Sequence, residues 1–185
     1  MNDDEDDDTP SWDLTGIPDN TRDLERSTDW FAAPDRTLQR MAYAADSGLG
    51  QGVSLTLVVP GGLLSGSVIS GPEYFTSVSQ RFREGIAELG DTEKDETAGE
   101  YADVHFDKVA KHEAELIEQD AQDFRDGKLK EPRYLMARYL HLSNAFYTVP
   151  GQQSMPLGFA RVLLSQVAAW SIGQSLNGVA NPYLS

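Results

Sequence analysis

Charge is divided unevenly along this chain, and the division separates segments suited to a core from segments that must stay in water. No Asp or Glu follows Glu131, so the segment 132–185 carries arginines as its only charged side chains. Residues 1–40 and 84–131, in contrast, hold 12 and 16 acidic side chains against 4 and 6 basic ones. The parts therefore present opposite signs, which makes association between copies through complementary charge possible. The candidate association surface comprises Arg133, Arg138 and Arg161.

Composition narrows the classes of partner and of chemistry. The formal charge of -15 over 185 residues repels phosphate backbones and anionic lipid surfaces, so we expect no nucleic-acid partner. The absence of Cys excludes disulfides, thiolate metal sites and Cys nucleophiles. The length fits one domain with a tail.

The ends of the chain differ in composition from its middle. The N-terminus is acidic where a secretory signal would be basic and then apolar, which favours a cytoplasmic protein. The longest mostly apolar stretch, 157–172, is shorter than the roughly 20 residues that cross a bilayer, so we expect core and no membrane insertion. Residues 1–29 lack any apolar period and are expected to form a disordered acidic tail. We expect a single α+β domain at 30–176, with a charged helical insertion at about 84–131, and a frayed C-terminus at 177–185.

Local patterns in the first half predict a helix followed by a hairpin. Apolar residues recur at helical spacing within 35–46, which predicts a short amphipathic helix. Residues 53–59 alternate in polarity as a half-buried strand does, Pro60-Gly61-Gly62 turns the chain, and 63–70 returns as a strand. Gly66 lies at the centre of the returning strand and predicts a sharp bend or a close backbone approach.

A capping box marks the start of a second helix. Ser70 stands at the N-cap with Glu73 three residues later, and apolar residues follow at helical spacing as far as Leu89. The polar segment 90–100 is expected to be a loop. Residues 101–126 predict a charged surface helix with only a narrow apolar stripe.

Beyond Pro132 the composition becomes apolar and predicts strands. A helix remains open as an alternative for 133–143, whereas 157–164 and 167–173 favour two closing strands. The fold class is therefore α+β, with a leading helix, a bent hairpin, two inserted helices and about three further strands. This order resembles the Sm-like or SH3-like small barrel, open or closed, as an analogy of element order alone.

The sequence shows no set of catalytic residues. Ser65 lacks the Gly-x-Ser-x-Gly context of a nucleophile elbow. His105 and His112 share a helix face but lack an HExxH spacing, so we expect them on a solvated helix rather than at a metal. No Gly-Lys-Ser/Thr follows the glycines near residue 62. We therefore expect no enzyme activity, no cofactor and no metal.

Two stretches carry a recognisable pattern. The first runs from Gly62 to Ser70 and continues with Glu73-Tyr74-Phe75, as a small-residue turn, a Ser-Gly-Ser strand return, Ile-Ser and a helix start. The second runs from His141 to Tyr147 and, after a Pro- and Gly-containing loop, from Arg161 to Gly173. Together these stretches resemble the gas-vesicle accessory protein family GvpU. The residues that carry the resemblance are Gly62, Ser65, Gly66, Ser67, Ser70, Glu73, Tyr74, Phe75, Phe82, Gly85, His141, Leu142 and Asn144.

The resemblance implies a non-enzymatic accessory protein that acts on assembled gas vesicles or on their clustering and tends to self-associate. Its implied partners are the vesicle shell, other accessory proteins and further copies of itself, in the cytoplasm at gas vesicles. The alternative is an Sm-like module that binds RNA or a protein and is unrelated to gas vesicles.

Overall fold

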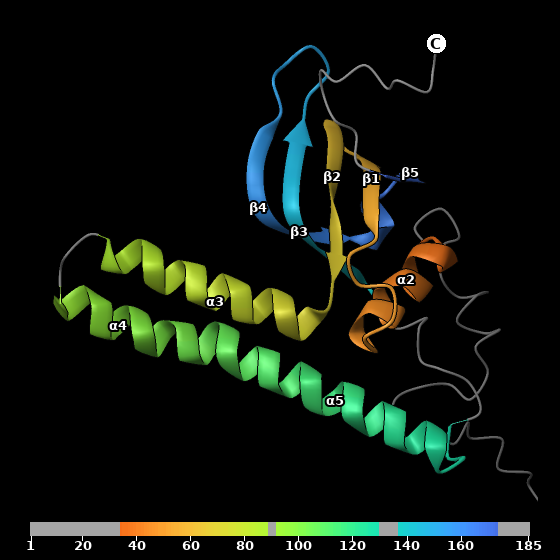
Figure 1. The fold of residues 1–185 in the computed structure, drawn as a ribbon, viewed down its shortest axis with the longest axis horizontal. Coiled ribbons are helices and arrows are strands. Elements are labelled where there is room, and N and C mark those ends of the chain that lie inside the picture. Colours follow the sequence, from red (N-terminus) through yellow and green to blue (C-terminus); the bar gives the residue numbers. More distant parts are fainter. Residues whose placement is uncertain (1–33, 89–91, 130–136, 174–185) are drawn as a thin grey trace, which may run out of the picture. The chain divides into compact units, whose positions relative to one another are not determined.

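The computed structural model describes residues 34–88, 92–129 and 137–173 (Figure 1). The expected tail at 1–29 and the expected frayed end at 177–185 lie outside these residues. In chain order the elements are α2 (Arg36–Asp46), β1 (Ser54–Val59), β2 (Gly62–Ile69), α3 (Gly71–Ala87), α4 (Thr92–Ala102), the π-helical turn η1 (Asp103–Asp107), α5 (Lys108–Arg125), β3 (Tyr139–Thr148), β4 (Met155–Leu163), the 3-10 turn η3 (Leu164–Gln166) and β5 (Ala169–Ile172).

The leading helix α2 forms as its sequence predicts. The Asp35 carboxylate caps it by accepting hydrogen bonds from the backbone N–H groups of Thr37 (2.8 Å) and Leu38 (3.0 Å). Leu38 and Ala45 on its apolar stripe are fully buried. The helix therefore covers the sheet with one face and leaves the other in water.

The strands form one antiparallel sheet in the order β4-β3-β2-β1-β5. The predicted hairpin is β1 and β2, with Leu57 opposite Leu64 and Val59 opposite Gly62. The strand prediction, made with a helix as the alternative for 133–143, is confirmed from Tyr139 onward, because β3 begins there and pairs with both β2 and β4; residues 133–136 lie outside the described part. The two closing strands are β4 and β5.

The core lies between α2 and one face of this sheet. Because side chains alternate between the faces of a strand, the core residues of β1 and β2 come from alternating positions, as do Leu140 and Leu142 of β3, and the bulge at Asn144 shifts the next one to Ala145. The largest fully buried side chains are Leu38, Leu55, Leu57, Val68, Leu140, Leu142 and Leu164.

The barrel suggested by the element order does not close. β4 and β5 lie at opposite edges of the sheet and do not pair with each other (Figure 1). β5 is only four residues long and pairs with β1 alone within the described residues. The fold is therefore an open five-stranded sheet with helices, and the closed form of the Sm-like analogy is wrong for this chain.

An arm of helices is inserted between β2 and β3, and α4 corrects the expected loop at 90–100. The sequence of α4 did not predict a helix because it contains few apolar residues. The helix packs on α3 through two buried alanines, Ala98 and Ala102. The Phe82 ring of α3 lies 5.4 Å from Tyr101 and 5.9 Å from Phe106, measured between ring centroids. Tertiary contacts with α3 thus stabilise a helix whose own sequence gives a weak signal.

A π-helical turn joins α4 to α5 and carries an ion-pair cluster. The Arg83 guanidinium of α3 donates to the carboxylates of Asp103 (2.6 Å) and Asp107 (2.5 Å) and to the Gly99 carbonyl (3.2 Å). One arginine therefore links α3 to both ends of the turn.

The helix α5 is the charged surface helix expected within 101–126. Ala110 is its one buried residue, while Val109, Ile117 and Ala121 are half-buried. Leu116 and Phe124 keep 48% and 50% of their surface exposed. Across the described part of the chain, no helix combines the length and the apolar character that crossing a membrane requires.

Candidate functional site

The two stretches singled out in the sequence lie side by side in the sheet. β2 pairs with β3, placing Val68 opposite Leu142 and Ile69 opposite His141. β2 then ends and α3 begins, so the stretches meet where the sheet passes into the helical arm (Figure 1). We call this region the junction; it consists of residues 69–75, Asp46, Tyr139, Glu113, His141 and Arg161.

A bulge in β3 accommodates the close approach predicted at Gly66. The register between β2 and β3 shifts after Ser65, and Asn144 adopts a positive φ of 46°. A Cβ at Gly66 would lie 2.9 Å from the Ser143 carbonyl oxygen and 3.1 Å from the Leu142 Cβ. Gly66 and Asn144 thus shape the backbone next to the junction.

The predicted cap begins α3 and positions two aromatic rings. The Ser70 hydroxyl accepts a hydrogen bond from the Glu73 backbone N–H (3.3 Å), which is one half of a capping box. The first turn then places the Tyr74 ring 4.8 Å and the Phe75 ring 5.9 Å from the His141 imidazole. His141 is enclosed by aromatic surface from α3.

The environment of His141 keeps its imidazole neutral. Burial, together with the smaller effect of the positive charge of Arg161, lowers the pKa of His141 from 6.5 to about 4. Only 8% of the residue is exposed, and its Nε2 atom has no hydrogen-bond partner among the described residues. The neutral imidazole packs against the two rings of α3.

Arg161 of β4 lies at the outer side of the junction. Its guanidinium carbon is 3.8 Å from the Tyr139 ring centroid and 5.3 Å from the Phe75 ring centroid. These are cation–π distances, and the residue itself remains exposed. The charge is therefore held in place by rings while one side faces solvent.

The three arginines of the candidate association surface have different settings. Arg138 is exposed just before β3, and its carbonyl accepts the Leu164 backbone N–H at 2.9 Å. Arg133 lies outside the described residues. Arg161 is the member that belongs to the junction.

Two carboxylates complete the junction and were missed in the sequence. The Asp46 carboxylate accepts the Gly71 backbone N–H at 2.8 Å, and the Glu113 carboxylate lies where a Cβ of residue 71 would stand. Burial raises the pKa of Asp46, although the hydrogen bond from Gly71 opposes this. Burial also raises the pKa of Glu113, the charge of Asp46 raises it further, and the charge of Arg161 lowers it.

A sequence signal for these carboxylates does exist. Glu113 interrupts the apolar stripe of α5, between Ala110 and Ile117, where every other member is apolar. Gly71 occupies the first helical position of α3 next to Pro72, although a side chain there costs nothing in an isolated helix. An acidic residue within an apolar stripe indicates a tertiary contact, and so does a glycine at a position where the local backbone does not require one.

The remaining residues of the family pattern are dispersed. Ser65 is buried and its hydroxyl lies 3.0 Å from that of Thr56, which donates to the Gly173 carbonyl at 2.8 Å. Phe82 and Gly85 belong to the arm, and nothing lies within 4 Å of a Cβ built at Gly85. The structure thus gathers Ser70, Glu73, Tyr74, Phe75 and His141 at the junction, places Leu142 in the core, and leaves Gly62, Ser65, Gly66, Ser67 and Asn144 along the strands.

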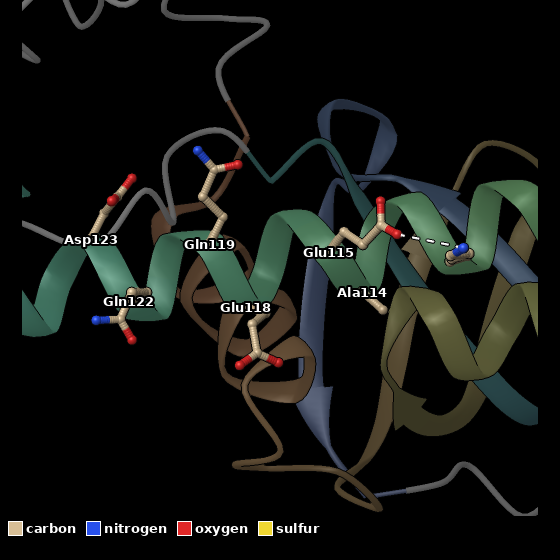
Figure 2. A pocket seen from close by; sticks show the side chains of 7 residues that line it. Ala114, Glu115, Glu118, Gln119, Gln122 and Asp123 are labelled. Carbon is tan, nitrogen blue, oxygen red and sulfur yellow. Dashed lines mark ion pairs between the residues drawn. The ribbon is translucent and has the colours of Figure 1, made fainter.

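The exposed face of α5 forms an open depression without the features of a binding pocket. Its lining side chains, shown in Figure 2, come from this helix alone: Lys111, Ala114, Glu115, Glu118, Gln119, Gln122 and Asp123. Lys111 and Glu115 form an exposed i,i+4 ion pair of 3.9 Å. His105 and His112 are both exposed, and within the described ranges no group of three or more His, Asp or Glu side chains could hold a metal ion.

Comparison with known proteins gives a family match. The family model described as "Gas vesicle protein GvpU-like" matches residues 35–175, which include the sheet, the arm and the junction. Neither a search of the curated proteins nor a search of the solved structures finds a match.

Proposed function

Because this chain belongs to the GvpU-like family of gas vesicle proteins, we propose that it is a non-enzymatic accessory protein that binds or clusters gas vesicles in the cytoplasm and self-associates. The observation that carries the proposal is the division of charge between two surfaces of one unit, the arm and the strands β3–β4.

The surface of β3 and β4 offers apolar side chains beside arginines. Residues 137–173 contain no acid, and Arg138 and Arg161 are exposed there. Phe146, Met155 and Leu157 keep 41%, 52% and 39% of their surface exposed. The register places Phe146 and Met155 on opposite faces of the sheet, so these side chains flank the edge strand β4 rather than forming one patch. Apolar side chains beside arginines at a sheet edge suit an acidic partner that has apolar side chains of its own.

The arm has that complementary character. Exposed acids such as Glu115 and Glu118 line α5, and the apolar side chains of Tyr101, Val104 and Leu116 are about half exposed among them. The arm of one copy therefore complements the β3–β4 surface of another. Repeated contacts of this kind would link copies and, with them, the vesicles that carry them.

The test is co-flotation. Tagged protein is mixed with gas vesicles, the buoyant fraction is raised at low centrifugal force and washed, and the tag is quantified. We expect the protein to rise with the vesicles. A protein that stays in the subnatant at every salt concentration would overturn the vesicle assignment.

Self-association has its own readout. Light scattering of the protein alone should fall as salt rises from about 0.05 to about 0.5 M, because ions screen surface charges. Replacing Arg133, Arg138 and Arg161 by Gln should lower it further, whereas replacing Arg36 and Arg40 of α2 by Gln, as the matched control, should have a smaller effect. Scattering that is indifferent to salt and to both sets of changes would contradict association by complementary charge.

A further inference from the structure

Three elements meet at one point of the junction through Asp46, Gly71 and Glu113. Asp46 is the last residue of α2, Gly71 the first of α3, and Glu113 lies in the second turn of α5. The Gly71 N–H donates to the Asp46 carboxylate at 2.8 Å, and Glu113 contacts Gly71 from the other side. Segments far apart in the sequence are thus joined by two carboxylates on one glycine.

This contact is centred on Gly71. A Cβ built on it would overlap the Glu113 carboxylate oxygen and would come within 3.5 Å of the His141 Cε1 atom. Any larger residue would have to displace the Glu113 carboxylate, the end of a flexible side chain, from its place beside Gly71. Glycine therefore leaves room for this carboxylate by close approach rather than by backbone conformation.

We propose that Asp46, Gly71 and Glu113 form a latch that holds α5 against α2 and α3 while Glu113 is protonated, and that ionisation of Glu113 beside Asp46 loosens it. The latch concerns the protein alone and does not depend on vesicle binding.

Weak apolar attachment makes α5 the element that can respond. It fully buries only Ala110, and its contacts further along rest on the half-buried Ile117 and Ala121. A change in the latch is therefore not outweighed by a large buried surface, as it would be in the sheet.

The groups around the latch determine the direction of its response. Two like charges lie close together, and burial raises the pKa of both, above 3.8 for Asp46 and above 4.5 for Glu113. Their stabilising contribution is complete below these ordinary values and is lost as the pH rises through the folded-state pKa values. Arg161 from β4 and His112 from α5 oppose the shift at Glu113, and the Tyr74 hydroxyl of α3 remains protonated throughout because burial raises its pKa above 10.0.

His141 of β3 acts in the opposite direction. Its pKa is lowered to about 4, so its contribution is present above 6.5 and is lost as the pH falls toward 4. His141 is present in the wild type and in every variant of the two carboxylates. A difference in pH response between these proteins therefore reports the titration of the carboxylates and not that of His141.

The chain contains no Cys, so spin labels can be placed without background. We would introduce Leu49→Cys after α2 and Gln119→Cys on α5, both at exposed positions, and measure the distance between labels by pulsed electron paramagnetic resonance. In the wild-type background we expect a narrow distribution at about pH 4, below the ordinary pKa of Glu113, and a broader, longer one at about pH 8. Identical distributions at the two pH values would overturn the proposal.

Isosteric variants separate the latch from other titrations. Glu113→Gln and Asp46→Asn keep the hydrogen-bonding shape without the second charge, so they should give the narrow distribution at both pH values. Gly71→Ala should give the broad one at both, while Gly85→Ala in the same helix, where a Cβ meets open space, should behave as the wild type. A Glu113→Gln variant that retains the full wild-type response would refute the latch even if Gly71→Ala fails to fold.

Discussion

The sheet and the arm are held together by different forces. The sheet with α2 encloses Leu55, Leu57 and Leu142, none of which has any exposed surface. The arm depends on small residues, on aromatic contacts around Phe82 and on the ion pairs of Arg83. We infer that the sheet supplies the free energy of unfolding, whereas the position of the arm is sensitive to salt and protonation.

The largest expected difference comes from one substitution made in both regions. Leu142→Ala should lower the free energy of unfolding by about 2–5 kcal/mol, because it leaves a cavity in a closed core. Leu116→Ala on α5, where the side chain is 48% exposed, should change it by less than about 0.5 kcal/mol. Urea unfolding followed by circular dichroism measures both. Equal losses would show that the arm contributes to the core after all.

Acid should reveal a second difference, at the boundary of the two regions. The His141 imidazole should titrate near pH 4 in nuclear magnetic resonance spectra, because burial disfavours its charged form. His141 stabilises the fold above pH 6.5, and this contribution is lost as the pH falls toward 4. His141→Phe should therefore unfold less readily than the wild type over that interval. A His141 midpoint near 6.5 would mean that water reaches the ring.

Two glycines extend the comparison to the backbone. Gly66→Ala in β2 should destabilise the protein by about 1–3 kcal/mol, since its Cβ would press on β3 at Ser143. Gly85→Ala in α3 should stabilise it by up to about 1 kcal/mol, because the Cβ meets open space within a helix. Thermal unfolding of the two variants gives the signs. Opposite signs to these would require a rearranged sheet or arm.

The smallest effect is expected at the π-helical turn. Arg83→Gln removes the ion pairs with Asp103 and Asp107 on an exposed surface, so it should raise amide hydrogen exchange in α4 and η1 and leave the sheet unchanged. Added salt should reduce the difference between variant and wild type. Faster exchange in β1 or β2 would show that arm and sheet unfold together.

Local patterns predicted much of the sheet because its residues satisfy local and tertiary demands at once. Alternation placed Leu55 and Leu57 on a buried face, and Ser70 caps α3 as its spacing predicts. Gly66 within a strand pattern predicts the close approach that β3 makes to it. In each case the residue whose sequence pattern predicts the element also makes a contact that stabilises that element in the folded protein.

The arm and the sheet closure could not be predicted in the same way. The helical state of α4 depends on Ala98 and Ala102 finding α3, which no window of its own sequence records. Whether β4 meets β5 depends on the bend of the whole sheet, and element order leaves it undetermined. The contact of Asp46 with Gly71 joins residues that no local period relates.

The pairing of Ile69 with His141 has a consequence for how such chains can diverge. The polypeptide leaves the sheet and returns to it at adjacent positions, with the arm as a side branch between them. Beyond Phe75, the helical arm can gain or lose whole turns without any change in the order or pairing of the strands. The sheet can thus stay constant while the length and charge of the arm vary.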